Sequence, residues 1–283
     1  MEKLQFVCDS TQKVFDAIIK TRPTLNFSIL QTALRKKDIR LNGKKITQNV
    51  EAFCGDEIIV YLSEKKQKQL QVVYQDNNIL IVNKPCGVEV TTKDKTYLDS
   101  PSLEELTGFE ACHRLDKNTE GLVVLAKNKT AKSVMFDVFK NHNLQKIYTA
   151  IATGKICKNG QNFVDYIKKT PNLAQICQKN DKNAKIAKLS YSVISQKNGL
   201  SLLGINLQTG RMHQIRAQLA SHGIFVLGDE KYGDKQQNKK YHTKKQQLCA
   251  SEIKFLSLPA PLNYLSGKQF CVTPSFSLDM FEK

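Results

Sequence analysis

Unbroken runs of apolar residues mark the predicted strands of this chain. The clearest reads GLVVLA at residues 121–126, and a run of this kind between polar flanks is typical of a buried strand. Further runs rich in branched or aromatic residues also predict strands, at 57–62, 71–74, 79–83, 146–154 and 200–207. A turn at Lys84-Pro85-Cys86-Gly87 follows one of them.

Apolar residues at helical spacing predict the helices of the same region. Segment 129–141 places Ala131, Val134, Met135, Val138 and Phe139 on one face. Segment 211–223 reads as a helix that stops at Gly223. Two lysine-rich stretches, 179–188 and 231–245, are expected to be mobile surface loops.

The first 62 residues follow a pattern of their own. Ser28 is a plausible N-cap for a helix over residues 29–37, and Asn42-Gly43 between apolar positions predicts a tight hairpin. The polar stretch that follows lacks apolar anchors and indicates a linker. The expected division is a small domain at 1–62, a linker at 63–75 and a large domain at 76–283.

Charge points to the class of partner. The chain carries 43 Lys and Arg against 26 Asp and Glu, a net charge of +17, while 41% hydrophobic residues suit an ordinary globular protein. A positive excess of this size favours a polyanionic partner such as nucleic acid. The alternative is a proteome that is rich in lysine throughout.

Cysteine spacing and hydropathy argue against several other classes. The eight cysteines include no C-x-x-C pair, so we expect free buried thiols in a reducing cytoplasm and no metal site. No apolar run reaches the roughly 18 residues of a transmembrane helix, and the N-terminus does not resemble a signal peptide.

The charged tetrad His113-Arg114-Leu115-Asp116 runs directly into the apolar 121–126 segment. Four interpretations compete. A kinase catalytic loop would need H-R-D-L and a D-F-G motif, which the chain lacks. A metal site would need further ligands nearby. A structural ion pair capping the strand remains open, as does a nucleophilic Asp116 on a loop that the strand aims.

A second set of polar residues favours the catalytic interpretation. Arg211, His213, Gln214 and Arg216 lie within six residues at a strand-to-helix junction, where a guanidinium can reach a carboxylate. Tyr148 lies in the predicted strand 146–154 between the two sets.

HRLDKNTEG, KIYTAIATG and TGRMHQIRAQL, in this order, closely resemble the RluA-type pseudouridine synthase family, with NKPCG and LGDEKYG in support. The resemblance covers residues 76–265 and implies roles for three residues. Asp116 would be the nucleophile, Tyr148 would stack on the target uracil and accept the C5 proton, and Arg216 would pair with Asp116. The chain departs from the family pattern at Glu120, where Ser is usual, and at Val90-Thr91, where His-Pro is common.

Residues 1–62 resemble the S4 RNA-binding fold, through LRKKDIRLNGKKI and the following Gly55-Asp56 pair, although Lys13-Val14-Phe15-Asp16 replaces the usual Arg-Leu-Asp. In that fold a helix end and a basic hairpin lie on RNA backbone. The resemblance therefore implies RNA contacts from Arg35, Lys36, Lys37, Arg40, Lys44 and Lys45. In the large domain we expect Arg114, Arg211 and His213 to contact RNA, and His113 to help hold its loop.

The expected fold is α+β, a small S4-like domain followed by a catalytic domain with a largely antiparallel central sheet. The implied reaction turns a uridine within RNA into pseudouridine and needs no cofactor, because nothing is oxidised and nothing leaves. Asp116 could attack C1′, as carboxylates do in glycoside hydrolysis, or C6 of the base. Large-subunit ribosomal RNA is the expected substrate of a monomeric enzyme. Transfer RNA, or a non-catalytic role in RNA binding or ribosome assembly, is the alternative.

Overall fold

The computed structural model describes residues 2–22, 25, 27–62, 70–91, 101–171 and 173–281. The chain divides into two compact units, residues 1–69 with 92–101 and residues 70–91 with 102–283. The predicted linker 63–75 is wrong at its C-terminal end, because Gln71–Gln75 form strand β7, whose backbone pairs with the neighbouring β8 in the larger unit. The rest of that prediction, 63–69, lies outside the described residues.

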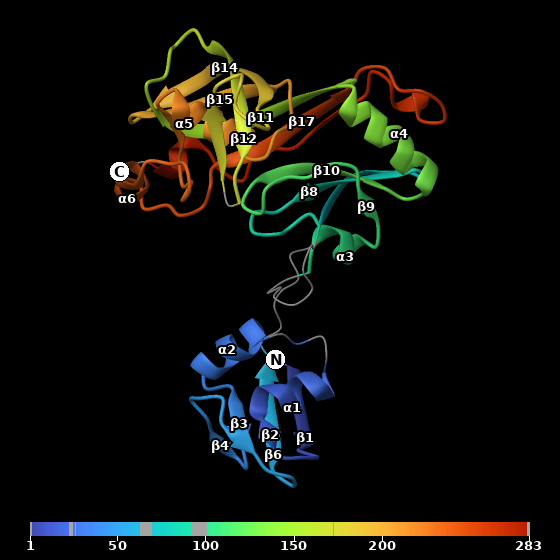
Figure 1. Cartoon of the computed structure of the whole chain (residues 1–283), viewed down its shortest axis with the longest axis vertical. Helices are drawn as coiled ribbons and strands as arrows, with labels where there is room; N and C mark the ends of the chain where they lie inside the picture. The colour runs from blue at the N-terminus through green and yellow to red at the C-terminus, as the bar shows by residue number, and fades with distance from the viewer. Residues whose placement is uncertain are drawn as a thin grey trace. The chain divides into compact units, whose positions relative to one another are not determined.

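In the smaller unit, helices α1 and α2 pack with an antiparallel sheet of order β1-β6-β3-β4 (Figure 1). Apolar residues of both helices and of β6, among them Phe15, Leu30 and Ile58, form one buried cluster. The elements are β1 Glu2–Val7, β2 Gln12–Lys13, α1 Val14–Thr21, α2 Phe27–Arg35, β3 Ile39–Leu41, β4 Lys44–Lys45, β5 Glu51–Ala52 and β6 Glu57–Leu62.

The predicted hairpin is confirmed. Asn42 and Gly43 both have positive φ, 50° and 76°, which a two-residue hairpin turn with the right twist requires. The Asn42 side chain also donates to Asp56 and accepts from the Glu57 backbone N–H, both at 2.8 Å, which fixes the turn against β6. Ser28 is not the N-cap, because α2 already begins at Phe27.

The larger unit is built on one extended, largely antiparallel sheet of order β13-β12-β14-β15-β11-β17-β10-β8-β7. β16 pairs with β11, β18 with β17 and β9 with β10. β10 and β17 are parallel where they meet, at Glu120 and Gly121. Figure 1 shows α4 at one end of this unit and α5 with α6 at the other. The architecture is α+β.

The strands of this unit are β7 Gln71–Gln75, β8 Ile79–Lys84, β9 Glu110–Ala111, β10 Glu120–Ala126, β11 Leu144–Gly154, β12 Gln161–Lys169, β13 Ala174–Cys177, β14 Lys185–Lys197, β15 Leu200–Leu207, β16 Ile224–Val226, β17 Leu248–Phe255 and β18 Gln269–Cys271. Its helices are α3 Leu103–Thr107, α4 Lys129–Lys140, α5 Gln214–Ser221 and α6 Lys235–Lys240, with short 3₁₀ turns at Asn263–Leu265 and Leu278–Phe281.

Strand β10 is buried on both faces, which explains its unbroken apolar run. Val123 and Leu125 join the core cluster on one side of the sheet, whereas Leu122 and Val124 join a second cluster that includes residues of α4. Burying a side chain of this size contributes about 1.5–3 kcal/mol. The loop before β10 therefore leads directly into a strand that is buried along its whole length.

Three local predictions are wrong. Helix α5 starts at Gln214 rather than 211, because the Gln214 side chain accepts from the Arg211 backbone N–H and His213 adopts a left-handed φ of 52°. The lysine-rich stretches are not simply loops, since they include the start of β14 and all of α6. The cysteines are free but not all buried: Cys54, Cys157 and Cys271 are exposed.

Among the described residues, no helix is long and apolar enough to cross a membrane.

Candidate active site

Asp116 lies on the loop between β9 and β10, and several contacts fix that loop. The Thr119 backbone N–H donates to the Asp116 carbonyl at 3.0 Å, and the Thr119 hydroxyl accepts from Gln246 Nε2 at 2.8 Å. Gly121 has φ +115° and passes so close to Ala250 that a Cβ would lie 2.4 Å from its carbonyl oxygen. The glycine of the HRLDKNTEG segment thus permits the close approach of β10 to β17.

Two further groups hold the same loop. The buried ammonium of Lys84 donates to the carbonyls of Pro85, Val88 and Lys117, and burial lowers the pKa of Lys84 to about 8. The backbone N–H of Val124 donates to Nε2 of His113 at 3.0 Å, and the imidazole stacks on Phe139 with ring centres 4.4 Å apart. Burial lowers the pKa of His113 to about 3, so it is a neutral structural group.

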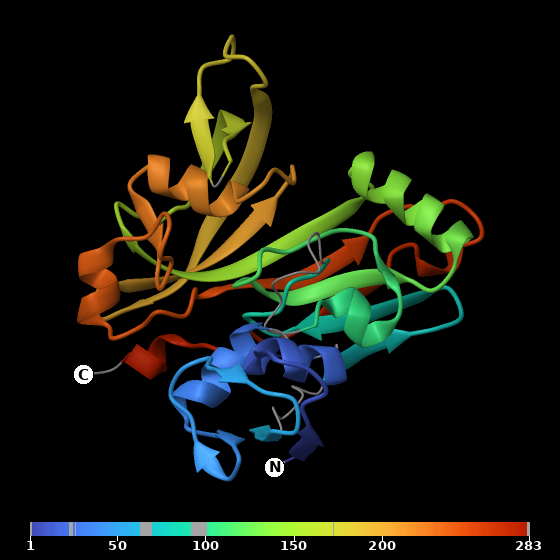
Figure 2. The same cartoon turned by 60° about the horizontal axis from the view of Figure 1, so that its bottom comes forward.

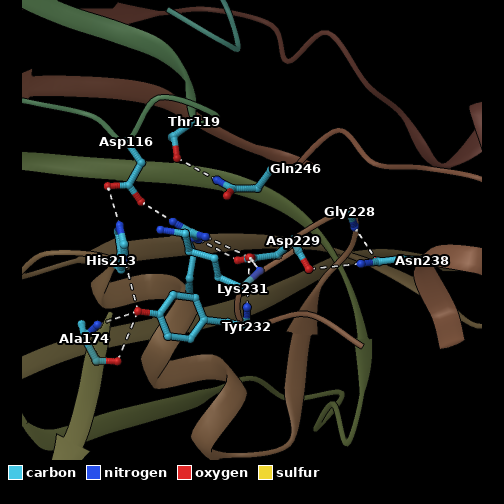
Figure 3. A network of polar contacts seen from close by, with 11 residues as sticks. Asp116, Thr119, Ala174, His213, Gly228, Asp229, Lys231, Tyr232, Asn238 and Gln246 are labelled. Atoms are coloured by element: carbon cyan, nitrogen blue, oxygen red, sulfur yellow. Dashed lines mark hydrogen bonds and ion pairs between the residues drawn. The ribbon is translucent and has the colours of Figure 1, made fainter. Parts of the chain in front are cut away.

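Arg216 connects the loop that carries Asp116 to a second carboxylate, that of Asp229, and Figure 3 labels both carboxylates. Its Nη1 donates to Asp116 Oδ2 at 2.8 Å, while Nε and Nη2 donate to Asp229 at 2.6 and 2.9 Å. Asp229 is fully buried and also accepts from the backbone N–H groups of Lys231 and Tyr232. Five-donor guanidinium geometry suits this double engagement, which lysine could not reproduce.

Electrostatic interactions keep both Arg216 and Asp229 ionised. Burial disfavours the charged guanidinium, but the two carboxylates outweigh it and raise the pKa of Arg216 above its usual value. Burial likewise opposes ionisation of Asp229, yet Arg216 and the two backbone donors lower the pKa of that carboxyl. Arg216 therefore presents a permanent positive charge to Asp116, which is partly accessible with 23% of its side chain exposed.

His213 flanks the other Asp116 oxygen. Its Nε2 lies 3.8 Å from Oδ1, and its Nδ1 lies 3.0 Å from the hydroxyl of Tyr232. That hydroxyl accepts from the Ala174 backbone N–H at 2.6 Å, and the Tyr232 ring lies 5.1 Å from the guanidinium carbon of Arg216 (Figure 3). Burial lowers the pKa of His213, so it is mainly neutral at pH 7.

These groups open into a cavity of about 510 Å³. Asp116 and the ring of Tyr148 line it together, and Tyr148 is 8% exposed. Burial, together with the charge of Asp116, raises the pKa of Tyr148, so its phenol stays protonated at neutral pH. Within the described part of the chain, the Tyr148 hydroxyl has no hydrogen-bond partner, which leaves it available to a ligand. The cavity wall also carries Arg114, Lys140, Lys146, Lys169 and Arg211.

The structure thus brings six predicted site residues to one cavity: Asp116, Tyr148, Arg216, Arg114, Arg211 and His213. The six predicted RNA contacts of the smaller unit fall within residues 35–45, at the end of α2 and on the β3–β4 hairpin. Of these, Arg35, Lys36, Lys37, Lys44 and Lys45 are exposed. Arg40 is half-buried, with its guanidinium 5.3 Å from the centre of the Tyr61 ring.

Sequence reasoning did not assign roles to Asp229, Tyr232 or Lys84. The LGDEKYG and NKPCG segments that contain them supported the family resemblance, and these segments were the available signal. The unusual Glu120 is also explained. It is buried, accepts from the backbone and hydroxyl of Ser275 at 2.7 and 2.6 Å, and pairs with Lys245 at 3.2 Å. It therefore holds the C-terminal segment against β10.

Comparisons with known proteins agree with this geometry. Residues 78–221 match the family model described as RNA pseudouridylate synthase. The ribosomal large subunit pseudouridine synthase C of Rickettsia bellii is 32% identical over 75% of this chain and 79% of that protein. A Mycoplasma capricolum protein named as an uncharacterized RNA pseudouridine synthase is 30% identical over 95% of this chain and 96% of that protein.

Among solved structures, human RNA pseudouridylate synthase domain containing 1 has the same fold, with a TM-score of 0.58 at 23% identity over 77% of this chain and 95% of that one. The sequence matches extend over the β9–β10 loop, β11 and α5, which carry Asp116, Tyr148 and Arg216. The chain belongs to the RNA pseudouridylate synthase family.

Proposed function

We propose that this pseudouridine synthase acts on uridine in large-subunit ribosomal RNA and uses Asp116 as its nucleophile. The observation that carries the catalytic part is the Arg216–Asp116 contact at 2.8 Å at the wall of a basic cavity. The substrate class is supported by the name of the Rickettsia bellii relative and by the +17 net charge, which suits a large polyanion.

The chemistry divides among three side chains. The N1–C1′ bond of the uridine breaks, the base turns, and a C5–C1′ bond forms while a proton leaves C5 and N1 gains one. An ionised Asp116 is required whether it attacks C1′ or C6, and Arg216 keeps a positive charge against it. The buried surroundings exclude water that would otherwise intercept the detached sugar.

Tyr148 serves first as a stacking surface for the extruded uracil. A base that leaves its helical stack gains from an aromatic neighbour, and Tyr148 lines the cavity beside Asp116. Its raised pKa makes the phenol a poor base in its resting state. As acceptor of the C5 proton, Tyr148 must therefore give up its own phenolic proton in the same event, and this transfer balances with the proton that N1 of the uracil gains.

The smaller unit is proposed to be an S4-like RNA-docking domain. Its exposed basic residues on the α2 end and the β3–β4 hairpin suit a phosphate backbone. We further propose that the enzyme acts in the cytoplasm. We propose that it is a monomer, because Asp116, Tyr148 and Arg216 already meet at one cavity within a single copy of the chain.

Mapping of pseudouridines in total RNA, from cells with and without this protein, tests the substrate. Loss of one or more sites in large-subunit ribosomal RNA is expected. Loss confined to transfer RNA would select that alternative, and an unchanged map would contradict a role in modification in those cells.

A further inference from the structure

The Asp116 cavity adjoins a second basic cavity. This neighbour, of about 500 Å³, is bounded by β12, β13, the start of β14 and the loop before α5. The two cavities share Lys169, Gly210, Arg211 and Met212 in their walls. In Figure 2 the strands around residue 175, drawn in yellow, project away from the rest of the sheet. The two cavities thus share part of their lining, at the end of β12 and in the loop before α5.

The cations along this lining have few partners. Lys168 is neutralised by Asp181, with Nζ and Oδ2 2.7 Å apart. In the part of the chain that the structure describes, Lys146, Lys169, Lys185 and Arg211 form no ion pair. Arg211 donates from Nε to the Ile186 carbonyl at 3.1 Å, which fixes its side chain and leaves its charge uncompensated.

Like charges held together in a cleft raise the local concentration of anions. Lys146 and Arg211 are half-buried beside one another, and burial together with the charge of Arg211 lowers the pKa of Lys146 to about 8. His142, also in the wall, has a pKa lowered by burial and by these two cations. Repulsion between Lys146 and Arg211 costs free energy, and an anion bound between these two cations would relieve that cost.

We propose that the cations from Lys146 through Arg211 to Lys169 and Lys185 bind consecutive phosphates of the RNA strand that leaves the Asp116 cavity. The inference rests on the proposed RNA substrate and adds a path for it. The occupant is single-stranded, because the track begins at the cavity that is proposed to receive the extruded uracil and continues into the adjoining basic cavity. The enzyme would therefore select uridines whose neighbours on one side are unpaired.

The test compares two double variants of the full chain. Lys169→Gln with Lys185→Gln removes two exposed charges of the track, and Lys155→Gln with Lys158→Gln removes two exposed charges outside both cavities. Binding of a fluorescent oligouridylate of about 12 nucleotides is measured at salt concentrations from about 50 to about 300 mM. Each lost single-strand phosphate contact makes the slope of log K against log salt less steep by about 0.7.

The track variant should lose about 1.4 from that slope and bind several-fold more weakly, while the control changes by less than half as much. Equal slopes in the two variants, or a wild-type slope in the track variant, would overturn the proposed track. Pseudouridine formation by the wild-type enzyme in ribosomal RNA is assayed in parallel. Its failure would overturn the proposed function, whatever the slopes are.

Discussion

Arg216 donates to Asp116 with one nitrogen and to the buried Asp229 with two others. Asp229 is fully buried and does not line the cavity, so it orients the guanidinium from behind, while Asp116 lies at the cavity wall. Asp229 is in turn fixed by backbone N–H groups of Lys231 and Tyr232. Asp116, the proposed nucleophile, thus obtains its counter-charge from a hydrogen-bonded assembly that begins 100 residues away in sequence.

Asp116→Asn should abolish isomerisation and leave RNA binding within a few-fold of wild type. Asparagine preserves the shape but cannot act as the nucleophile, whereas affinity depends mainly on phosphate contacts elsewhere. Tritium release from RNA labelled at C5 of uridine measures turnover, and filter binding measures affinity. Turnover above about a tenth of wild type would remove Asp116 from the nucleophilic role.

Asp229→Asn should reduce both stability and rate. Removing one partner of a buried ion pair typically costs about 3–5 kcal/mol, and it leaves Arg216 with the partly exposed Asp116 as its remaining carboxylate partner. The freed guanidinium also loses its orientation toward Asp116, so single-turnover isomerisation should fall by about 10-fold or more. Urea unfolding measures the free energy of unfolding of the variant and of the wild type.

The matched control is Asp279→Asn, because Asp279 pairs with Lys197 at the surface and its side chain is 74% exposed. It should cost less than about 1 kcal/mol and leave the rate unchanged. If Asp229→Asn behaves like this control, Asp229 does not position Arg216.

The strand and tetrad at 113–126 were predictable because their signals are local. A continuous apolar run requires burial on both faces, and charged residues at its start need partners or a chemical role. The hairpin at Asn42-Gly43 was predictable for the same reason, since its turn chemistry is contained in two residues.

The site residues that escaped prediction act through non-local contacts. Asp229 meets Arg216 across 13 residues and a change of element, and no periodicity encodes that meeting. The start of α5 depends on the Gln214 side chain, which binds Thr209 and the Arg211 backbone instead of solvent. The helix therefore begins at Gln214 and not at Arg211.

Tyr148→Phe separates stacking from proton transfer. The phenylalanine ring still packs on uracil, so RNA affinity should remain within about two-fold of wild type. Loss of the hydroxyl should lower single-turnover isomerisation by about 10²-fold or more, if it handles the C5 proton. Tyr148→Leu should lose the stacking surface as well and bind more weakly. A phenylalanine variant with nearly full activity would assign Tyr148 to stacking alone.

Acidification should destabilise the fold through His113. Its pKa is about 3 in the folded protein and ordinarily about 6.5, so the unfolded chain binds the proton more readily. Stability is therefore unaffected above about pH 6.5 and declines as the pH falls toward 3, by on the order of 2 kcal/mol at pH 5.

The control for this pH dependence is a second histidine variant. His113→Gln, whose amide oxygen can still accept from Val124, should flatten the decline in urea unfolding measured between about pH 4.5 and 7.5. His242→Asn changes an exposed side chain and should leave the decline as it is in wild type. If stability falls as steeply in the His113 variant as in wild type, groups other than His113 cause the decline.

The smaller unit should contribute affinity without catalysis. Neutralising Arg35, Lys36, Lys37, Arg40, Lys44 and Lys45 removes its basic surface while the Asp116 cavity stays intact. RNA binding should weaken, with a salt slope less steep by about 0.7–0.9 for each lost phosphate contact, because counterion release scales with contacts.

A chain that begins at Leu70 should behave likewise, since the larger unit has its own core clusters. At saturating RNA its single-turnover rate should match that of the full chain, as a tethered docking domain raises effective concentration only. Exchanging Lys and Arg at the six positions keeps the charge and serves as the control. If neutralisation and truncation both leave affinity and slope unchanged, the basic hairpin is merely a solvated surface and the S4-like proposal fails.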